Sequence, residues 1–331
     1  ADARGTPLPD EVLESVKRNK VALKGPIGTP IGKGFRSVNV TLRQTLDLYA
    51  NVRPIRSLPH VEPRFEGTDI VIIRENTEDL YAGLELMIMP GVAQSIKLIT
   101  ERSCLRICEY AFDYAERIGH EHYVRIDDDP HAVGMATGIN TRQGCRHILK
   151  YAFDTAIATG RKKVTLVHKA NIMKLSDGLL LDCFRKVARD YPQIEPAEII
   201  VDACALQMIK NANKLDVIVT ENLYGDILSD LGAGLVGGLG IVPGANIGKD
   251  CAVFEAVHGS APDIAGRGIA NPTAVVQSAV MMLRHLHDDA SADKIERALT
   301  TLYAGGEHRT GDLGGKANTK EFTDALCKLV S

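Results

Sequence analysis

The run Val164-Thr165-Leu166-Val167 decides the fold class, because it is a short apolar segment that ends at a polar turn. Such a run is typical of a buried strand in a parallel sheet. Asp69 to Ile73 and Asp216 to Thr220 have the same character. Helical patterns follow at Gly178 to Asp190 and Gly225 to Leu231. Strand, turn and helix in rotation predict an α/β architecture with a largely parallel sheet.

The segments before these runs are shorter. Val12 to Val16 is part of a predicted helix, and Val21 to Leu23 is a predicted short strand. That strand runs into the loop Gly25 to Gly34, which is rich in glycine and proline. Val40 to Tyr49 has a helical pattern.

One segment of the chain is nearly repeated. Ile99 to Gly119 resembles Ile139 to Gly160, and both contain the run Tyr-Ala-Phe-Asp. Two amphipathic helices joined by a polar segment would explain the likeness. We interpret the pair as an excursion that packs subunits together, with a regulatory ligand site in the connecting segment as the less favoured alternative.

Composition limits the classes of function. The chain has 331 residues, which favours two packed units. Its hydrophobic content of 45% and net charge of -3 are ordinary for a globular protein, and we expect neither nucleic-acid binding nor a membrane span. Seven scattered cysteines favour reduced thiols. Because no signal or transit pattern opens the chain, we expect a cytoplasmic protein, with the mitochondrial matrix as the alternative.

Polar residues at the ends of apolar runs predict an anion site. Ser37 and Asn39 supply a hydroxyl and an amide, and Arg43, Arg53 and Arg74 supply three guanidinium groups. Guanidinium groups pair with carboxylates through two parallel hydrogen bonds. The set therefore predicts a site for a small molecule that carries several carboxylates.

Acidic residues predict a metal site. Asp226 and Asp230 are four residues apart, so on a helix they share one face. Neighbouring glycines favour a buried location, and Asp202 follows an apolar run and could supply a third ligand. Oxygen ligands of this kind suit Mg²⁺ or Mn²⁺. Two such carboxylates without further support are more often exposed surface groups.

Two residues are candidates for proton transfer. Lys169 follows the run that ends at Val167, and a lysine at a strand end can have its pKa lowered by burial or by a neighbouring cation. Tyr81 lies eight residues after Ile73. A lone lysine is more often a solvated charge, and most tyrosines are packing residues with a polar tip.

Two glycine-containing segments have different meanings. Gly232 to Gly237 fits the G-x-G-x-x-G pattern, but it follows a helical segment and not a strand, so we interpret it as close helix packing. Glu255 to Gly266 contains small residues that would let backbone N–H groups approach a phosphate. There Asp263 could accept hydrogen bonds from ribose hydroxyls, although an ordinary surface loop is the alternative.

The motifs together resemble those of the isocitrate/isopropylmalate dehydrogenase family, the β-decarboxylating dehydrogenases, most closely the NAD-dependent isocitrate dehydrogenases. The resemblance covers almost the whole chain in family order. It rests on these runs: Lys24–Pro26 with Thr29-Pro30, Arg36–Arg43, Tyr49–Pro54, Ile73–Tyr81 (IRENTEDLY), His168–Lys174, Val201–Cys204, Glu221–Leu231 (ENLYGDILSDL), Glu255–Gly266 and Gly268–Pro272 (GIANP). It implies the family's own non-Rossmann α/β fold, with a large and a small domain around a central cleft.

The resemblance also assigns domains. Residues 1–48 and 237–331 would form a discontinuous, cofactor-binding large domain that lacks its N-terminal segment. Residues 49–80 and 160–236 would form the small domain, and residues 81–159 a clasp-like dimerisation excursion. A homodimer or a higher oligomer would share its active sites between subunits.

The resemblance implies NAD-dependent oxidative decarboxylation of isocitrate to 2-oxoglutarate and CO₂, a reaction of the tricarboxylic acid cycle. Tyr81 and Lys169 would be catalytic, with Lys169 supplied by the partner subunit. The substrate would contact Ser37, Asn39, Arg43, Arg53 and Arg74. Mg²⁺ or Mn²⁺ would be held by Asp226 and Asp230, joined by Asp202 from the partner subunit.

The cofactor implied by the resemblance is NAD. The pocket would consist of Thr29, His258, Gly259, Ser260, Ala261, Asp263, Ile264 and Asn271. NADP-dependent relatives carry basic groups where this chain has Asp263-Ile264, and a carboxylate there would repel a 2′-phosphate.

Alternatives to isocitrate oxidation remain within the same family. Ser37 and Asn39 favour isocitrate over 3-isopropylmalate, whose apolar group would call for apolar partners. Homoisocitrate differs by one methylene, which binding pockets reject weakly. A non-catalytic regulatory subunit of a hetero-oligomer is the third possibility, although such subunits are expected to lose catalytic or metal-binding groups that this chain retains.

Overall fold

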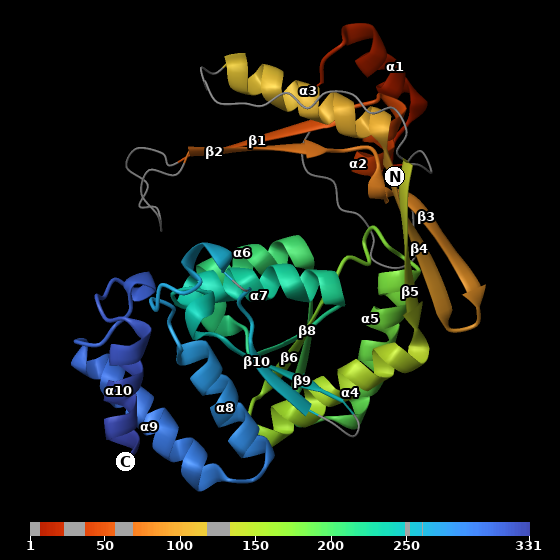
Figure 1. Cartoon of the computed structure of the whole chain (residues 1–331). Helices are drawn as coiled ribbons and strands as arrows, with labels where there is room; N and C mark the ends of the chain where they lie inside the picture. Colours follow the sequence, from red (N-terminus) through yellow and green to blue (C-terminus); the bar gives the residue numbers. More distant parts are fainter. Residues whose placement is uncertain (1–6, 23–36, 57–68, 118–132, 249–251, 260) are drawn as a thin grey trace. The chain divides into compact units, whose positions relative to one another are not determined.

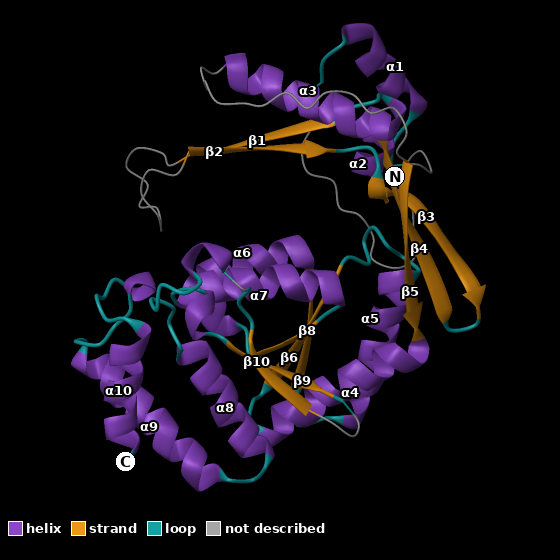
Figure 2. Ribbon diagram, viewed as in Figure 1, coloured by secondary structure: helices purple, strands orange, loops and turns teal. Residues whose placement is uncertain are grey.

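Strands and helices alternate along the part of the chain that the computed structural model describes, residues 7–22, 37–56, 69–117, 133–248, 252–259 and 261–331 (Figures 1 and 2). The predicted α/β class is therefore confirmed. The chain divides into two compact units. The first unit comprises Ala1–Val201 and Leu215–Thr220, and the second comprises Asp202–Lys214 and Glu221–Ser331.

The first unit contains eight strands and several helices among its described residues. The strands are β1 (Ala50–Arg56), β2 (Asp69–Glu75), β3 (Asp79–Met89), β4 (Val92–Thr100), β5 (Val133–Thr141), β6 (Lys163–His168), β7 (Glu195–Ile200) and β8 (Val217–Val219). The helices are α1 (Asp10–Asn19), α2 (Val38–Thr45), α3 (Glu101–Arg117), α4 (Arg142–Ala158), α5 (Ser176–Val187) and the short η1 (Ala188–Asp190).

The run that decides the fold class forms the centre of a parallel sheet. The strand order is β7-β6-β8, and both pairings of β6 are parallel. Val164 to Val167 are all buried, because β6 has a strand on each side and helices against it. The predicted buried strand at Val164–Val167 is thus confirmed. The strand predicted at Asp216–Thr220 exists as β8 (Val217–Val219), of which only Val219 is buried.

The other described sheets are antiparallel, so the parallel arrangement extends only to β6, β7 and β8. β1 pairs with β2, and β4 lies between β3 and β5. The strand predicted at Asp69–Ile73 exists as β2, but its buried character is wrong. Ile70 is 55% exposed and Ile72 is 46% exposed, because β2 belongs to a two-stranded sheet.

Two further predictions near the N-terminus need correction. Val21 and Ala22 form no strand, and Leu23 lies outside the described residues. The helix predicted to reach Tyr49 ends at Thr45. The chain then turns through Asp47, whose φ is +47°, a left-handed conformation that a continuing helix does not allow.

Each copy of the near-repeat covers the last residues of a strand and the helix that follows it, β4 with α3 in the first copy and β5 with α4 in the second. The two helices are therefore confirmed. Each begins with a threonine that caps its first turn. Thr100 Oγ1 accepts a hydrogen bond from Ser103 N at 3.3 Å, and Thr141 Oγ1 accepts one from Gly144 N at 3.1 Å. In Figure 1, α3 runs along the β1–β2 ribbon, where it contacts β2.

The core of the first unit lies around α4, α5 and β6. The side chains of Leu149, Phe153 and Leu166 are fully buried, and Phe184 is 2% exposed. The Phe153 ring stacks on Tyr191, with centroids 4.9 Å apart. Burying one such side chain contributes roughly 1.5–3 kcal/mol, so this cluster is a principal source of stability for the unit.

The second unit joins two helices to a hairpin and a helical C-terminal region. Its described elements are α6 (Val201–Asn211), η2 (Ala212–Lys214), α7 (Asn222–Val236), η3 (Leu239–Ile241), β9 (Pro243–Ile247), β10 (Ala252–Ala256), η4 (Pro262–Ile264), α8 (Thr273–His285), α9 (Asp289–Gly305), η5 (Gly311–Leu313) and α10 (Thr319–Val330). α8 packs on the β9–β10 hairpin and on α9. Phe322 and Leu326 of α10 pack against Leu299 and Leu302 of α9.

The glycine pattern at Gly232–Gly237 lies within α7 and at its end, as expected for helix packing. A Cβ added at Gly232 would lie 3.4 Å from Met208 Cε on α6. Gly237 ends the helix with φ +124°. None of the helices in the described ranges is long and apolar enough to cross a membrane. The predicted large, small and clasp-like domains follow different boundaries from the two compact units, and they stay a prediction.

Candidate functional site

Ser37, Asn39 and Arg43 belong to α2 and its cap. Ser37 is 5% exposed and precedes the first helical residue, where its Oγ accepts a hydrogen bond from Val40 N at 3.5 Å. A serine at this position satisfies a backbone N–H that would otherwise lack a partner. Asn39 and Arg43 are four residues apart in α2, so they lie on one face of the helix.

Arg53 and Arg74 lie on the β1–β2 ribbon. Asn51 stands opposite Arg74 in the antiparallel register, and Arg53 is two residues farther along β1, so all three share one face. Arg53 Nε donates to Asn51 Oδ1 at 2.7 Å. The ribbon therefore presents both guanidinium groups on the same side.

The three arginines form one electrostatic cluster. Burial lowers the pKa of Arg43, and the positive charges of Arg74 and then Arg53 lower it further, while Tyr81 acts in the opposite direction. Positive charges that repel one another are costly to hold together. A polyanion placed among them would relieve that repulsion.

Tyr81 lies at the edge of this arginine cluster. The guanidinium carbon of Arg74 is 4.7 Å from the centroid of the Tyr81 ring, a cation–π contact. Gln44 Nε2, on α2, donates to Tyr81 O at 3.1 Å and to Thr77 O at 3.4 Å. One side chain of α2 thereby holds the backbone that carries Tyr81.

A cavity of about 240 Å³ opens beside Tyr81. Its walls are formed by Ser37, Val40, Tyr81, Gly83, Glu85, Asn171, Ile172 and Lys174. Two of the predicted site residues thus line one cavity. Residues that follow Lys169 line it as well, from the same chain as Tyr81.

Lys169 follows the last residue of β6 in a tightly bonded turn. Its backbone N–H donates to Asp177 Oδ2 at 2.5 Å, and Asp177 is fully buried. His168 is 1% exposed, and its Nδ1 accepts a hydrogen bond from Ala170 N at 3.0 Å. Burial lowers the pKa of His168, so the ring is neutral at pH 7.

Glu85 joins β3 to the start of α5. Its carboxylate accepts hydrogen bonds from Ser176 Oγ at 2.6 Å, from Ser176 N at 3.0 Å and from Leu175 N at 3.2 Å. A carboxylate at a helix N-terminus is stabilised by the partial positive charge there. The strand that carries Tyr81 is therefore fastened to the segment that follows Lys169.

Sequence reasoning did not identify Glu85 or Asp177 as parts of the site. Glu85 stands between Leu84 and Leu86, and an acidic residue at an alternate position of an apolar strand was the available signal. Asp177 lies in the run Ser176-Asp177-Gly178, which has the composition of a helix start.

The predicted metal ligands belong to the second unit. Asp226 and Asp230 are on α7, one helical turn apart, and Asp202 is the second residue of α6. All three are exposed, so the buried neighbourhood expected for the pair is wrong for this chain. Among the described residues, no three His, Cys, Asp or Glu side chains are grouped as a metal site. Asp226 and Asp230 by themselves offer the hard oxygen donors that Mg²⁺ accepts from one or two carboxylates.

The predicted cofactor residues are spread over the loop before α8. His258, Gly259, Ala261 and Asp263 are exposed, and Ile264 is half-buried at the end of η4. His258 Nδ1 lies 3.0 Å from Gly259 O. Thr29 and Ser260 lie outside the described residues.

Asn271 has a structural environment that the sequence did not indicate. It is 8% exposed, its Nδ2 donates to Asp312 Oδ2 at 3.0 Å, and its Oδ1 accepts from Thr273 N at 3.0 Å. Asp312 also accepts a hydrogen bond from Thr310 Oγ1 at 2.5 Å. Asn271 therefore connects the start of α8 to the segment around η5.

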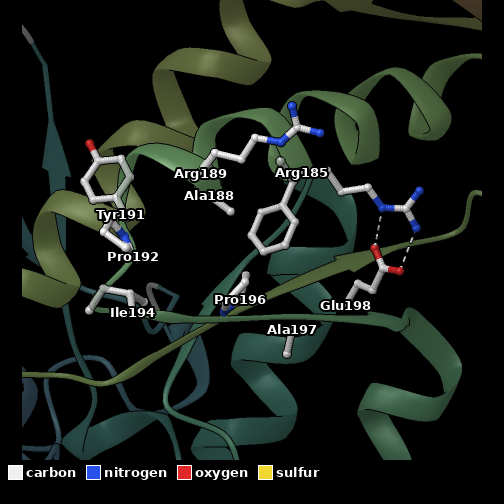
Figure 3. Close-up of a pocket in the computed structure, with 10 residues that line it drawn as sticks. Arg185, Ala188, Arg189, Tyr191, Pro192, Ile194, Pro196, Ala197 and Glu198 are labelled. Atoms are coloured by element: carbon white, nitrogen blue, oxygen red, sulfur yellow. Dashed lines mark hydrogen bonds and ion pairs between the residues drawn. The ribbon is translucent and has the colours of Figure 1, made fainter.

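A larger cavity, of about 610 Å³, contains none of the predicted site residues. It lies between the end of α5 and β7, and its lining includes Tyr191 and Arg189 (Figure 3). Arg185 in its wall pairs with Glu198 through Nη2 to Oε1 at 2.7 Å and Nε to Oε2 at 3.1 Å. The smaller cavity beside Tyr81 is lined by two of the predicted site residues, Ser37 and Tyr81, so it is the better candidate for the substrate site.

Comparisons with known proteins identify the family of the chain. The model of the family described as isocitrate/isopropylmalate dehydrogenase matches residues 1–130 and 118–326. The chain is similar to "Isocitrate dehydrogenase [NAD] catalytic subunit 5, mitochondrial" of Arabidopsis thaliana, with 49% identity over 96% of this chain and 74% of the relative.

Other relatives have different roles. A mitochondrial regulatory subunit of NAD-dependent isocitrate dehydrogenase from Dictyostelium discoideum is 45% identical over 98% of this chain and 81% of its own length. "3-isopropylmalate dehydrogenase, chloroplastic" of Solanum tuberosum is 47% identical over 90% of this chain and 72% of its own length.

The fold is similar to that of a solved structure. The crystal structure of isocitrate dehydrogenase from Methylococcus capsulatus matches with a TM-score of 0.59 and 45% identity, covering 98% of this chain and 86% of that one. With the family model matching nearly the whole chain, this protein belongs to the isocitrate/isopropylmalate dehydrogenase family.

Proposed function

We propose that this chain catalyses the NAD-dependent oxidative decarboxylation of isocitrate to 2-oxoglutarate and CO₂. The observation that carries the proposal is the cluster of Arg43, Arg53 and Arg74 beside Tyr81. Isocitrate has three carboxylates, and arginine forks bind carboxylates in pairs of hydrogen bonds. The names of NAD isocitrate dehydrogenase relatives support the same substrate.

Ser37 and Asn39 support isocitrate over 3-isopropylmalate. Both side chains are polar, and Ser37 is in the wall of the cavity beside Tyr81. A polar wall suits the third carboxylate of isocitrate better than the apolar group of 3-isopropylmalate, because an apolar group makes no hydrogen bond to a polar side chain.

The chain supplies both proton transfers. NAD, when bound, would accept the hydride of C2. Lys169 would take the proton of the 2-hydroxyl group of isocitrate. The 2-oxo product then loses CO₂, and the electron pair of the broken bond forms an enolate. The Tyr81 hydroxyl donates the proton that converts this enolate to 2-oxoglutarate.

A bound Mg²⁺ or Mn²⁺ would polarise the substrate oxygen at which negative charge develops. Asp226 and Asp230 would hold it from one helix face. Asp202 of the partner subunit would complete the ligand set, which fits the exposure of all three carboxylates in a single chain.

The test is a steady-state assay of the purified chain with NAD and Mg²⁺. We expect turnover of isocitrate, with kcat/KM at least tenfold above the values for homoisocitrate and 3-isopropylmalate. A higher kcat/KM for 3-isopropylmalate would refute the assignment of Ser37 and Asn39.

A regulatory role is the second candidate, because a relative with 45% identity carries that description. The retained Tyr81, Lys169 and three aspartates favour a catalytic chain. The discriminating experiment adds a catalytic relative to the purified chain. If the chain is inert by itself and only modifies the activity of the added relative, the regulatory role holds.

NAD is proposed over NADP because of Asp263. This carboxylate is exposed in η4, where it could accept hydrogen bonds from ribose hydroxyls and would repel a 2′-phosphate. Equal kcat/KM with the two cofactors would contradict the proposal. In a NAD-specific chain, Asp263→Lys should lower the preference for NAD.

Assembly into dimers or higher oligomers is proposed from exposed apolar side chains. Leu206 on α6 and Leu223 and Ile227 on α7 are each more than half exposed. Apolar residues repeated on one helix face are commonly covered by a partner. A second copy of the chain is the proposed occupant in a homo-oligomer, and the mitochondrial names of the relatives favour the mitochondrial matrix over the cytoplasm.

A further inference from the structure

The side chain of Arg106 on α3 bonds two connecting segments of the first unit, the turn between α2 and β1 and the corner between β2 and β3. Its Nη1 donates to Asp47 Oδ1 at 2.8 Å and to Asp47 Oδ2 at 3.0 Å. Its Nη2 donates to Thr77 Oγ1 at 2.8 Å. The guanidinium also lies over the Tyr49 ring, 4.6 Å from its centroid, and the side chain is 19% exposed.

Both connections lead directly to proposed substrate residues. Asp47 and Tyr49 lie in the turn between α2 and β1, which carry Arg43 and Arg53. Thr77 lies in the corner between β2 and β3, which carry Arg74 and Tyr81. Arg106 therefore bridges the two pieces of chain from which the arginine cluster is built.

The corner around Thr77 is itself tightly bonded. Glu75 accepts hydrogen bonds from Thr77 Oγ1 at 2.7 Å, from Thr77 N at 3.0 Å and from Glu78 N at 2.9 Å. Arg106 Nη2 is 3.9 Å from Glu75 Oε1. A movement of Arg106 relative to Thr77 would consequently displace the whole corner.

We infer that Arg106 is a positioning residue that fixes the spacing between the arginines of the substrate site and Tyr81. The inference rests on the proposed function for its substrate. Arg74 and Arg53 both repel Arg43, so the position of Arg43 relative to them needs a restraint that does not come from these arginines. The guanidinium fork supplies it, since it bonds the Asp47 carboxylate and the Thr77 hydroxyl at once while stacking on Tyr49.

A lysine keeps the charge but cannot form the fork, so Arg106→Lys separates the two effects. Thr77→Val removes the hydroxyl that accepts from Arg106 and donates to Glu75, and it serves if the first variant does not fold. The near-repeat supplies a matched control. Arg146 has the corresponding position in α4 and is exposed, so Arg146→Lys should change neither substrate binding nor stability.

The experiment measures KM for isocitrate and for NAD, kcat, and amide hydrogen exchange of the ligand-free chain. For Arg106→Lys we expect KM for isocitrate to rise roughly tenfold or more, from the loss of charge-assisted hydrogen bonds, with KM for NAD unchanged. Exchange should accelerate in residues 44–53 and 75–81, and Arg146→Lys should behave as the parent chain.

Three outcomes have distinct meanings. If Arg106→Lys has the parent KM for isocitrate and the parent exchange rates, the inference is overturned. It is also overturned if both KM values change equally while exchange accelerates throughout the chain, since that indicates general destabilisation. If the parent chain does not turn over isocitrate, the proposed function fails, and the exchange in residues 44–53 and 75–81 still decides whether Arg106 holds the two connections.

Discussion

At the scale of single residues, the site combines groups that repel with groups that restrain. Arg43 and Arg74 are close enough for each charge to act on the other, and Tyr81 stacks against Arg74. Such an arrangement is costly without ligand, because the charges of Arg74 and Arg53 both oppose the charge of Arg43. Substrate affinity should therefore respond strongly to any added negative charge.

Ser37 offers a direct test of that response. Ser37→Asp should raise KM for isocitrate at least tenfold, since a carboxylate at this position repels the substrate and partly neutralises the arginines. Aspartate caps helices as well as serine does, so α2 should persist. Ser37→Asn is the uncharged control, and circular dichroism checks the fold. An unchanged KM in the aspartate variant would show that Ser37 lies away from the substrate.

Tyr81 can be tested without disturbing its stacking. Tyr81→Phe keeps the ring over which Arg74 lies and removes only the hydroxyl group. If that hydroxyl is the proton donor, kcat should fall roughly 10²- to 10⁴-fold while KM for isocitrate changes little. Tyr151→Phe, at an exposed position on α4, is the control. A kcat close to that of the parent would remove Tyr81 from the proton transfer.

At the scale of elements, some apolar patterns predicted both the element and its burial, and others did not. β6, with five successive buried residues, formed as expected, and so did α3 and α4. β2 formed too, but two of its isoleucines are exposed, because the antiparallel pairing that decides burial is not encoded within the strand. The predicted strand at Val21 failed, since a strand needs a neighbour to pair with.

In the candidate site as well, local sequence patterns predicted some features and could not predict others. Motif resemblance identified Arg43, Arg74 and Tyr81, which the structure brings together. The bonds that hold these elements join positions distant in sequence. Glu85 bonds Ser176 across 91 positions, and Arg106 bonds Asp47 across 59 positions. Local patterns carry no information about such partners.

Glu85 joins two elements, and its removal should affect both. Glu85→Ala should lower the free energy of unfolding by about 1–2 kcal/mol, because α5 loses its cap and Ser176 loses a charge-assisted partner. Urea denaturation measures this difference. Glu109→Ala, at an exposed position on α3, should change stability by less than about 0.5 kcal/mol. Equal effects of the two substitutions would contradict the capping role.

The end of β6 should make stability depend on pH. Burial lowers the pKa of His168 below its ordinary 6.5, so the unfolded chain binds a proton more readily than the folded chain. The resulting stability is fully present above pH 6.5 and is lost as the pH falls toward the lower, folded pKa. His168→Asn keeps an acceptor but cannot titrate, so its unfolding free energy should vary less between pH 6.5 and 5. His308→Asn, which is exposed, should retain the parent slope.

At the scale of the whole molecule, the proposed metal site requires two copies of the chain. Asp202→Asn and Asp226→Asn should each reduce activity strongly. If Asp202 acts in the partner's site, mixing the two inactive variants under subunit exchange should restore activity, because half of the sites in each hybrid dimer are intact. Each hybrid dimer should therefore approach half the activity of a parent dimer.

Failure of that mixture to recover activity would place all metal ligands within one chain. The same design with Lys169→Ala and Tyr81→Phe identifies which chain supplies the lysine. That pair is informative because residues following Lys169 line the cavity beside Tyr81 of their own chain. Analytical ultracentrifugation of each mixture verifies that the subunits have associated.

The duplicated strand–helix segment also bears on how the chain folds. β4 and β5 have nine residues each, begin with valine, end with threonine and lead into helices of seventeen residues. β4 pairs with β3, yet β5 offers an alternative strand of equal length for the same edge. A chain that pairs β5 with β3 first must separate them before the native sheet forms. We therefore expect competition between these two strands to slow refolding of the chain.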